Sequence, residues 1–509
     1  MRILSVLLVL LVGNIYLLRS QTYCEYKYDH VWIMGGIDID TVTTDEWGGS
    51  EINFNSVPVS FSLHPKPVRI PFQNASMSSK SGELLFYSNG CIVLNAMDVE
   101  MQNRDSLNPG EPYTLNCPEH GYVGFQNMIS IPDSYNDSLF YLFHVAHEFN
   151  HDTNPLFFVQ SKYLYCTIIN AFSNNGHGSV REKNREIIVD TGMIGTPLTA
   201  VKHANGLDWW IITPDRWTNS FYTILLDQNG PHSQGQQFIG IATDPHSEGG
   251  QGKFSPDGNR FAWYHPKNGL FLYDFNREDG RLSNFRHIEI PFSNYITGGC
   301  EFSPTGRFLY VNHDTSLFQL DIIAPDIQVS LTHIADFDGF GDPLPTTFFY
   351  MERTPDKRII MNVLNGSQFL HVIQEPDKKD IACRFEQHAI MLPTVNNFTL
   401  PHFPNYRLGA LGEPLCDSMI VSTIDQYSLS SDKYKIIPNP ASDYIQLLPF
   451  EDIHSGDVSV GIIDLFGHMV LSSKEMTIDV SYLPPGIYFL RIMDNDKFVQ
   501  QSKLIIAGK

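Results

Sequence analysis

Short apolar runs separated by turn residues recur along the middle of the chain. Residues 254–264 read FSPDGNRFAWY and residues 302–311 read FSPTGRFLYV, so each predicts a strand, a tight turn and a second strand. A second hairpin pattern follows each of them, at 268–274 and at 314–321. Glycine, asparagine and aspartate suit these turns because they tolerate positive φ. Two hairpins in series predict a four-stranded antiparallel meander.

The same arrangement recurs at regular intervals. Turn markers stand 48 to 69 positions apart, close to the length of one propeller blade; they are Gly82, Asp137, Gly206, Gly258, Gly306 and Asp356. Residues 31–61 have room for a seventh blade, which strand residues near 398–408 would complete. Radial stacking buries both faces of each small sheet, and no helical pattern separates the strands as in a parallel α/β fold. We therefore predict an all-β fold with a seven-bladed β-propeller at residues 21–417.

The pattern changes beyond this repeat region. A polar, serine-rich stretch at residues 418–433 predicts a linker. Residues 434–509 then show short strand patterns joined by glycine and proline turns, which predicts a small immunoglobulin-like β-sandwich. The strands predicted in it are 436–437, 444–448, 458–465, 468–471, 487–493 and 503–506.

The N-terminus carries an export pattern. Arg2 precedes residues 3–18, which are apolar except for Ser5, Gly13 and Asn14. This predicts a secretory signal peptide at residues 1–20, cut after Ser20; an uncleaved N-terminal anchor is the alternative. No later run reaches the roughly 20 apolar residues that a membrane span needs, so we expect no transmembrane span once the signal is removed.

Charge and cysteine usage narrow the function classes. The net charge of -22 creates a field that repels phosphate backbones, so we expect no nucleic-acid partner. The seven cysteines show no C-x-x-C spacing, which favours structural roles over a zinc ribbon. Their odd number leaves at least one thiol unpaired or paired between chains. A bridge between Cys24 and Cys416, which bracket the predicted propeller, is a hypothesis for closing the ring.

Two segments of the body carry a family resemblance. The repeats with F-S-P-x-G resemble those of the WD-repeat-like and lactonase-like propeller superfamily. Residues 200–210 (AVKHANGLDWW) and 400–409 (LPHFPNYRLG) resemble exported propeller proteins of Bacteroidetes-type bacteria. The resemblance implies the fold rather than an activity.

Residues 434–509 resemble the type A C-terminal sorting domain of the type IX secretion system. The matching segments are 438–441 (PNPA), 464–467 (DLFG), 483–488 (LPPGIY) and 503–506 (KLII). The motif residues are Pro438, Asn439, Pro440, Gly467, Gly486, Tyr488 and Lys503. The resemblance implies a type IX translocon as the partner in export, and a secreted or cell-surface location. An accessory immunoglobulin-like module is the alternative.

One local motif suggests metal chemistry. Residues 147–151 read HEFNH, the H-E-x-x-H pattern in which two histidines on a helix bind zinc and the glutamate activates water. Residues 139–145, however, predict a strand, and Asp152 to Pro155 follow as a turn. No third ligand stands at a suitable spacing, because His177 lies in a loop rich in glycine and asparagine. We therefore expect no catalytic zinc.

Other candidate sites are also weak. Asp38, Asp40, Asp45 and Glu46, and separately Asp336, Asp338 and Asp342, could hold Ca²⁺, but neither set completes the calcium-loop pattern. Whether either set binds a metal stays open. The favoured interpretation is that these residues form turns on an acidic surface. The rings of Trp209, Trp210, Trp217, Trp263, Tyr222 and Tyr264 could line a carbohydrate face, although core packing explains them better. No G-x-S-x-G elbow, phosphate-binding loop or dinucleotide fingerprint is present, so no catalytic residue and no cofactor is predicted.

Two functions remain in view. The first is a non-enzymatic binding, adhesion or scaffold protein, whose loops meet an extracellular glycan, peptide or matrix partner. The alternative is a secreted hydrolase or lactonase whose acid and base residues come from several blades and converge on the central channel. A structure without a cluster of acids, histidines or a metal at the channel mouth would rule out the second.

Overall fold

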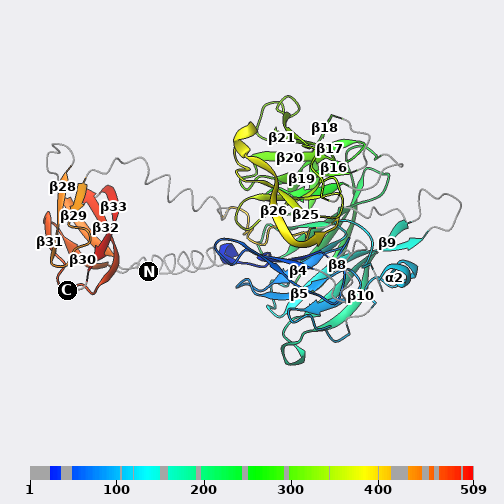
Figure 1. Ribbon diagram of the computed structural model, residues 1–509, viewed down its shortest axis with the longest axis horizontal. Helices are drawn as coiled ribbons and strands as arrows, with labels where there is room; N and C mark the ends of the chain where they lie inside the picture. Colours follow the sequence, from blue (N-terminus) through cyan, green and yellow to red (C-terminus); the bar gives the residue numbers. More distant parts are fainter. Residues whose placement is uncertain are drawn as a thin grey trace, which may run out of the picture. The chain divides into compact units, whose positions relative to one another are not determined.

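The computed structural model describes residues 23–35, 49–103, 106–117, 120–149, 159–190, 197–243, 250–291, 297–342, 344–398, 400–413, 434–449, 458–463, 469–494 and 497–507. Contacts divide the chain into two compact units, residues 1–416 (unit 1) and 417–509 (unit 2), each built from β-strands (Figure 1). The all-β prediction is confirmed. In the described part of the chain no helix has both the length and the apolar character needed to cross a membrane.

The described residues of unit 1 form seven small antiparallel sheets, in each of which consecutive strands lie side by side. Two of these sheets have three strands: β1–β3 (Val31–Met34, Ser50–Asn53, Ser60–Leu63) and β4–β6 (Ala75–Ser78, Leu84–Ser88, Val93–Asn95). The other five have four strands: β7–β10 (Met128–Pro132, Leu139–Phe149, Val159–Asn170, Ser179–Val189), β11–β14 (Thr199–Lys202, Trp209–Pro214, Ser220–Asp227, Gly230–Phe238), β15–β18 (Gln251–Phe254, Arg260–His265, Gly269–Asn276, Arg281–Ile288), β19–β22 (Gly298–Phe302, Phe308–His313, Ser316–Asp321, Thr332–Asp336) and β23–β26 (Phe348–Arg353, Ile359–Val363, Ser367–Ile373, Phe385–Asn396).

The two clearest sequence repeats form the hairpins that their pattern predicts. In the first, Gly258 adopts a φ of 71° and its N–H donates to the Ser255 carbonyl (2.8 Å), which joins β15 to β16. In the second, Gly306 adopts a φ of 73° and donates to the Ser303 carbonyl at the same distance, which joins β19 to β20. Both turns need a left-handed residue, and glycine adopts that conformation without steric cost.

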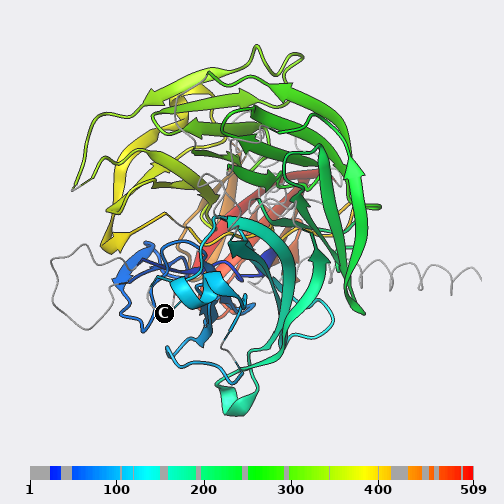
Figure 2. The same cartoon turned by 90° about the vertical axis from the view of Figure 1, so that its right-hand side faces the viewer.

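Neighbouring sheets contact each other, and the last sheet contacts the first. β4 contacts β1 and β7, and the first strands β11, β15, β19 and β23 contact one another in order. The ring closes where β26 contacts β2 and β3, and Ser50 Oγ lies 3.0 Å from Thr394 Oγ1. Figure 2 shows the sheets of unit 1 arranged around a common centre. This is a propeller-like arrangement.

The prediction that residues 398–408 add a strand is wrong. Among the described residues of that stretch, 398 and 400–408, none belongs to a strand. Pro401 and Pro404 lack a backbone N–H, so they cannot donate to a strand ladder. The last sheet meets the first directly through β26 instead.

Residues 400–413 form a crossing segment that runs through the centre of the ring. Near its start, the His402 ring lies 3.0 Å from the side-chain amide of Gln126, just before β7 begins. In its middle, the Tyr406 hydroxyl donates to a carbonyl within β7 (2.7 Å). Near its end, the N–H of Leu411 donates to a carbonyl in the turn after β11 (2.7 Å). His402 also lies 3.1 Å from Lys253 of β15 and 3.3 Å from Glu352 of β23, so the segment contacts the first strands of several sheets.

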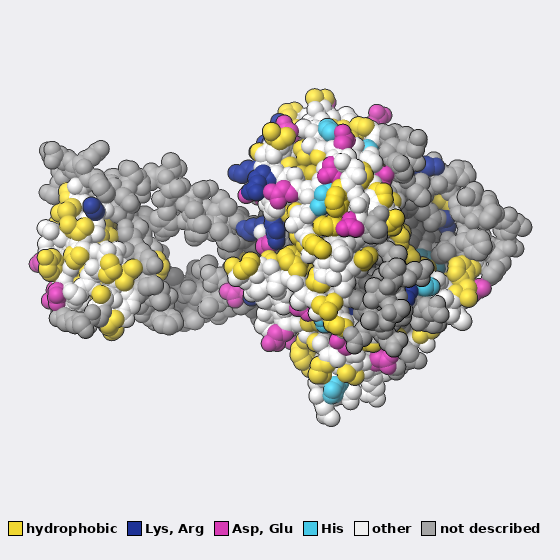
Figure 3. All heavy atoms as spheres, viewed as in Figure 1, with side chains coloured by type: hydrophobic (Ala, Val, Ile, Leu, Met, Phe, Trp, Pro, Cys, Tyr) yellow, Lys and Arg dark blue, Asp and Glu magenta, His cyan; other side chains and the backbone are white. Residues whose placement is uncertain are grey.

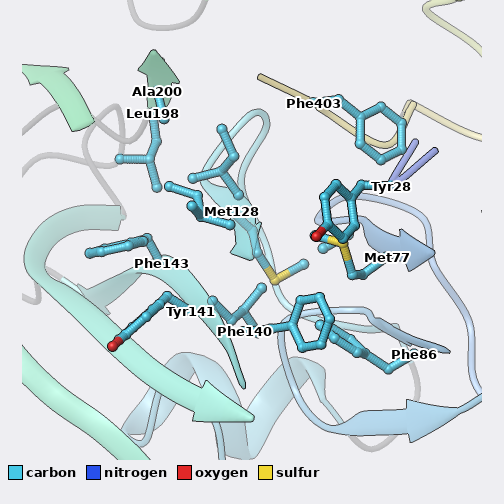
Figure 4. Packing of buried hydrophobic residues seen from close by; sticks show 14 of the residues in the cluster. Tyr28, Met77, Phe86, Met128, Phe140, Tyr141, Phe143, Leu198, Ala200 and Phe403 are labelled. Carbon is cyan, nitrogen blue, oxygen red and sulfur yellow. The ribbon is translucent and has the colours of Figure 1, made fainter. Parts of the chain in front are cut away.

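The largest apolar cluster of unit 1 packs against this segment. Figure 4 shows Phe403 of the crossing segment near Tyr28 of the N-terminal stretch, with Met77 of β4 and Phe140 of β8 farther along in the same cluster. Burial of such side chains is the main favourable contribution to folding. The crossing segment is thus part of the core of unit 1.

Unit 2 consists of two small sheets in its described residues. One contains β27, β28 and β31 (Tyr434–Ile437, Tyr444–Pro449, Thr477–Asp479); the other contains β30, β29, β32 and β33 (Met469–Ser473, Val458–Ile463, Gly486–Asp494, Lys497–Ile506). Ile445 and Leu447 of the first sheet share one buried cluster with Val460 and Leu490 of the second. The six predicted strands are confirmed where the structure is described, and β33 begins six residues before its predicted start. Residues 464–465 and 468 of two predicted strands lie outside the described residues, and the short β31 was not predicted.

The cysteines serve structure in the described part of the chain. Cys91 and Cys117 form a disulfide, and Cys24 is also disulfide-bonded. Cys166, Cys300 and Cys383 are free and buried. The hypothesis of a Cys24–Cys416 bridge cannot be followed further, because Cys416 lies outside the described residues.

Candidate functional site

The H-E-x-x-H motif lies on a strand, as its flanking residues predict. His147 and Glu148 belong to β8, where successive side chains point to opposite faces. His147 is buried, its Nδ1 lies 3.1 Å from Ser161 Oγ, and burial lowers its pKa to about 4. Glu148 pairs with Lys162 at the surface (2.8 Å). His151 lies outside the described residues, and the helical zinc geometry is absent at the two residues that are described.

Two members of the described carboxylate cluster, Asp336 and Asp338, are engaged with protein partners. Asp336 accepts hydrogen bonds from Ser316 (2.7 Å) and His333 (2.8 Å), and Asp338 pairs with His388 (3.0 Å). The other cluster, Asp38 to Glu46, lies outside the described residues. No group of three His, Cys, Asp or Glu side chains placed to hold a metal occurs where the structure is described. On the face of unit 1 seen in Figure 3, acidic side chains are scattered rather than gathered in one patch.

The aromatic residues singled out in the sequence are mostly core residues. Trp209, Trp210 and Trp263 are buried, as are Tyr222 and Tyr264. The indole N–H of Trp210 donates to the Arg277 carbonyl (2.9 Å). Trp217 is the exception, with 37% of its surface exposed.

A buried group of four ionisable side chains was not predicted from the sequence. This ionic cluster contains Lys253 of β15, Glu301 of β19, Glu352 of β23 and His402 of the crossing segment. Lys253 Nζ lies 2.5 Å from Glu352 Oε2, 3.0 Å from Glu301 Oε2 and 3.1 Å from His402 Nδ1. Its members come from four separate segments, so no linear motif in the sequence predicts it.

The charges of the ionic cluster depend on one another. Burial raises the pKa of Glu352 to about 7, although the nearby Lys253 ammonium opposes this rise. Burial lowers the pKa of Lys253, but the carboxylates of Glu301 and Glu352 outweigh it and leave that pKa raised. Burial and the Lys253 charge lower the pKa of His402. The lysine is therefore positive and the histidine neutral, and Glu352 exchanges a proton near neutral pH.

The ionic cluster is enclosed by protein. Its side chains belong to residues that are only 2% to 5% exposed. The adjoining cavity measures about 10 Å³, which is room for about one water molecule. Phe125 and Phe398 border this cavity, with ring centroids 5.8 Å apart, and Phe72 stacks on Phe398 at 5.5 Å. The cluster holds four segments together at the centre of the ring.

A hollow of unit 1, which we call the groove, measures about 660 Å³. The turns after β4, β7 and β11 form its walls, together with Tyr26, Tyr28 and the end of the crossing segment. Charged side chains line it: Lys80, Lys202, Asp133, Asp137 and Glu413. The groove lies at the end of the ring where the crossing segment emerges.

Two tyrosines of the groove are held by neighbouring turns. The Tyr135 hydroxyl donates to Asp208 Oδ1 (2.8 Å), and Asn205 donates to the other oxygen of that carboxylate (2.6 Å). Burial and the Asp208 carboxylate raise the pKa of Tyr135 to about 12. Lys80 pairs with Asp137 (2.6 Å), and its ammonium lies 5.2 Å from the centroid of the Tyr26 ring.

Lys202 lies at the floor of the groove. Its ammonium donates to Ser134 Oγ (3.0 Å) and to the Leu207 carbonyl (3.2 Å), and it lies 4.3 Å from the Trp209 ring centroid. Burial, with a smaller contribution from the Arg277 charge, lowers the pKa of Lys202 to about 7. The Ser134 hydroxyl donates to the Leu207 carbonyl (2.5 Å), so its proton points away from the lysine.

The sorting motif joins the start of unit 2 to its last strand. Asn439 Oδ1 accepts the N–H of Ile505 (2.9 Å), and the N–H of Ala441 donates to the Ile505 carbonyl (2.8 Å). Pro438 and Pro440 flank Asn439 between β27 and β28. Farther along, the Tyr488 hydroxyl donates to the Pro484 carbonyl (2.8 Å).

The remaining motif residues are placed only in part. Gly486 begins β32, the strand that also carries Tyr488, and Lys503 lies in β33. Gly467 falls outside the described residues. Within the described part, the motif thus marks the loop that starts the domain and the strand pair that ends it.

Solved structures share low identity with this chain. A functionally unknown protein from Desulfotomaculum acetoxidans is 13% identical over 74% of this chain and 100% of its own, with a TM-score of 0.41. A periplasmic gluconolactonase from Pseudomonas aeruginosa is 10% identical over 74% and 100% (TM-score 0.39). A gluconolactonase from Xanthomonas campestris is 11% identical over 66% and 94% (TM-score 0.28). None of them bears on the activity of this chain, and no curated protein sequence matches it.

The family models give a match at the C-terminus. Residues 435–507 match the secretion system C-terminal sorting domain, over the same stretch as the resemblance found in the sequence. A sorting domain of this kind directs export to the cell surface or the extracellular space. The C-terminal domain of this chain is a sorting domain of the type IX secretion system.

Proposed function

We propose that this chain is an exported, non-enzymatic binding protein. In this proposal unit 1 is a seven-bladed β-propeller that presents its groove to an extracellular ligand. Unit 2 is an immunoglobulin-like sandwich that the type IX translocon handles. The seven sheets of unit 1 and the two packed sheets of unit 2 support these assignments.

The observation that carries the proposal is the filled centre of the ring. The crossing segment is buried against the first strands of several sheets, and the ionic cluster beside it is enclosed by protein. The groove, by contrast, is open and lined by turns. Loops on a rigid scaffold are where binding residues concentrate, and a pocket of several hundred Å³ suits a ligand.

A secreted hydrolase is the second candidate, and one contact favours it. Ser134 Oγ lies 3.0 Å from Lys202 Nζ, and a serine beside a lysine of lowered pKa is an arrangement that supports nucleophilic catalysis. The hydrogen bond from Ser134 to the Leu207 carbonyl argues against this role, because the lysine then donates to the serine rather than accepting its proton. The ionic cluster also contains acidic and basic side chains, but they are enclosed by protein, so a substrate has no access to them.

Turnover assays on the purified full chain test the proposal. We expect no hydrolysis of nitrophenyl esters, sugar lactones or peptides, and no labelling by a fluorophosphonate probe. Catalysis that Ser134→Ala or Lys202→Met abolishes would establish the hydrolase instead. Catalysis lost in Glu352→Gln alone would locate the chemistry at the ionic cluster.

A further inference from the structure

We propose that the groove binds a neutral glycan, with a sugar ring stacked on Tyr135. This inference rests on the proposed binding function and names its ligand class. Tyr135 is 49% exposed and projects from the turn between β7 and β8. Its hydroxyl is fixed by Asp208, so the ring is held in place before a ligand arrives. A fixed aromatic ring loses little conformational entropy on binding, and its apolar face suits the C–H face of a sugar.

Hydrogen-bond acceptors surround this ring. Asp133 lies just before Tyr135 and accepts the N–H groups of Tyr135 (2.7 Å) and Asn136 (3.1 Å) through one oxygen, and the Tyr141 hydroxyl through the other (3.3 Å). Asp137 follows and pairs with Lys80. Each ionised carboxylate offers about four acceptor positions, so these protein contacts leave positions for sugar hydroxyls. The contacts also fix the orientation of both carboxylates.

The floor of the groove supplies donors. The buried indole N–H of Trp209 finds no acceptor among the described residues, and Trp209 lines the groove. Lys202 forms no ion pair with any described carboxylate. The Lys202 ammonium has three N–H groups, of which two donate to Ser134 and to the Leu207 carbonyl, and a ligand hydroxyl or ring oxygen can accept from the third.

The balance of charge favours a neutral ligand. Asp133, Asp137 and Glu413 repel an anion, while Lys80 and Lys202 repel a cation. A polyhydroxylated neutral molecule meets neither penalty and uses both donors and acceptors. A peptide is less suited, because the groove is lined by turns and strand ends and offers no length of unpaired strand to extend.

Calorimetric titration of the full chain tests the inference. The probes are oligosaccharides of glucose, xylose, mannose and N-acetylglucosamine, three to six units long. We expect at least one series to bind, and Tyr135→Ala to weaken it about tenfold or more, as the loss of an aromatic anchor does. Asp133→Asn should weaken binding as well. Phe238→Ala is the matched control, because that ring is 68% exposed on β14, away from the groove, and should leave binding unchanged.

The possible outcomes distinguish failure of the glycan inference from failure of the proposed binding function. Binding of a glycan that Tyr135→Ala does not affect overturns the placement in the groove. If no oligosaccharide binds but a random peptide library yields binders that Tyr135→Ala abolishes, the glycan inference fails while the binding function stands. Ester or lactone turnover lost in Ser134→Ala overturns the proposed function itself. Near-native far-ultraviolet circular dichroism of each variant confirms that it folds.

Discussion

Arg407 and Asp29 lie 378 positions apart in the sequence and form a two-armed ion pair. Arg407 Nη1 lies 2.8 Å from Asp29 Oδ1, and Nη2 lies 2.5 Å from Oδ2. Asp29 is buried beside β1, near the start of unit 1, and Arg407 belongs to the crossing segment near its end. Bidentate pairs of this kind fix geometry as well as charge. The pair therefore links the N-terminal part of unit 1 to its C-terminal part.

Replacing Arg407 by glutamine should destabilise unit 1. The change leaves the Asp29 carboxylate buried without its counter-charge, and we expect the free energy of unfolding to fall by about 3 kcal/mol. All six tryptophans precede residue 417, so tryptophan fluorescence during urea denaturation reports on unit 1 alone. The control is Arg281→Gln, since Arg281 is exposed and lies 3.9 Å from Asp279, where we expect a change below about 1 kcal/mol. An equal fall in the free energy of unfolding in both variants would show that the Arg407–Asp29 pair does not stabilise unit 1.

The two residues of the H-E-x-x-H motif should respond differently to substitution. His147→Ala removes a buried ring that stacks on Tyr122, with centroids 5.6 Å apart, and leaves Asn127 and Ser161 without a partner. We expect a loss of about 2–4 kcal/mol. Glu148→Ala breaks a surface pair and should cost less than about 1 kcal/mol. Zinc bound to the unaltered chain and lost in both variants, measured by elemental analysis, would contradict the strand interpretation.

Local pattern was enough to predict the repeats. The F-S-P-x-G segments specify a turn through Gly258 and Gly306, whose positive φ only glycine adopts freely, and the flanking alternation specifies the strands. The route of residues 400–413 was not predictable in this way. Apolar residues such as Phe403 and Tyr406 fit a strand or a buried extended segment equally well, and only the space at the centre of the ring decides between them.

The candidate sites depended on long-range placement. Lys253, Glu301, Glu352 and His402 each stand alone in the sequence, and only the closure of the ring brings them together. The groove likewise joins turns of three sheets, although its turn residues Asp137 and Gly206 were recognised one by one. The sorting motif was readable because its residues keep a fixed order within one short domain.

The stability of unit 1 should depend on pH through Glu352. Its pKa is raised by burial from 4.5 to about 7 in the folded protein, so the folded state holds a proton that the unfolded state releases. The resulting stabilisation is complete below the unfolded pKa and is lost as the pH rises from about 4.5 to 7. Lys253 and the neutral His402 contact Glu352, and the positive charges of Lys253 and Arg353 oppose the rise of its pKa.

Glu352→Gln removes this titrating group and retains its shape. We expect the urea midpoint of the unaltered chain to decrease as the pH rises from 5 to 8. The midpoint of the variant should change less over this range. Asp137→Asn, on an exposed surface pair, is the control and should leave the pH profile unchanged. A profile that is identical in the unaltered chain and Glu352→Gln would assign the titration to another group.

Export should need both ends of the chain in sequence. Residues 1–20 carry the predicted signal for the inner membrane, and residues 434–509 contain the sorting domain for the outer membrane. Unit 1 has apolar cores of its own, and its last described contacts end at residue 413, so a chain that stops at residue 433 should still fold.

In a host with a type IX system, we expect this truncated chain to stay in the periplasm, resistant to protease and with native tryptophan fluorescence. The full chain should reach the surface or the medium, and a chain lacking residues 2–20 should remain in the cytoplasm. Cell fractionation followed by immunodetection measures all three, and recovery of the truncated chain from the medium would contradict the role assigned to the sorting domain.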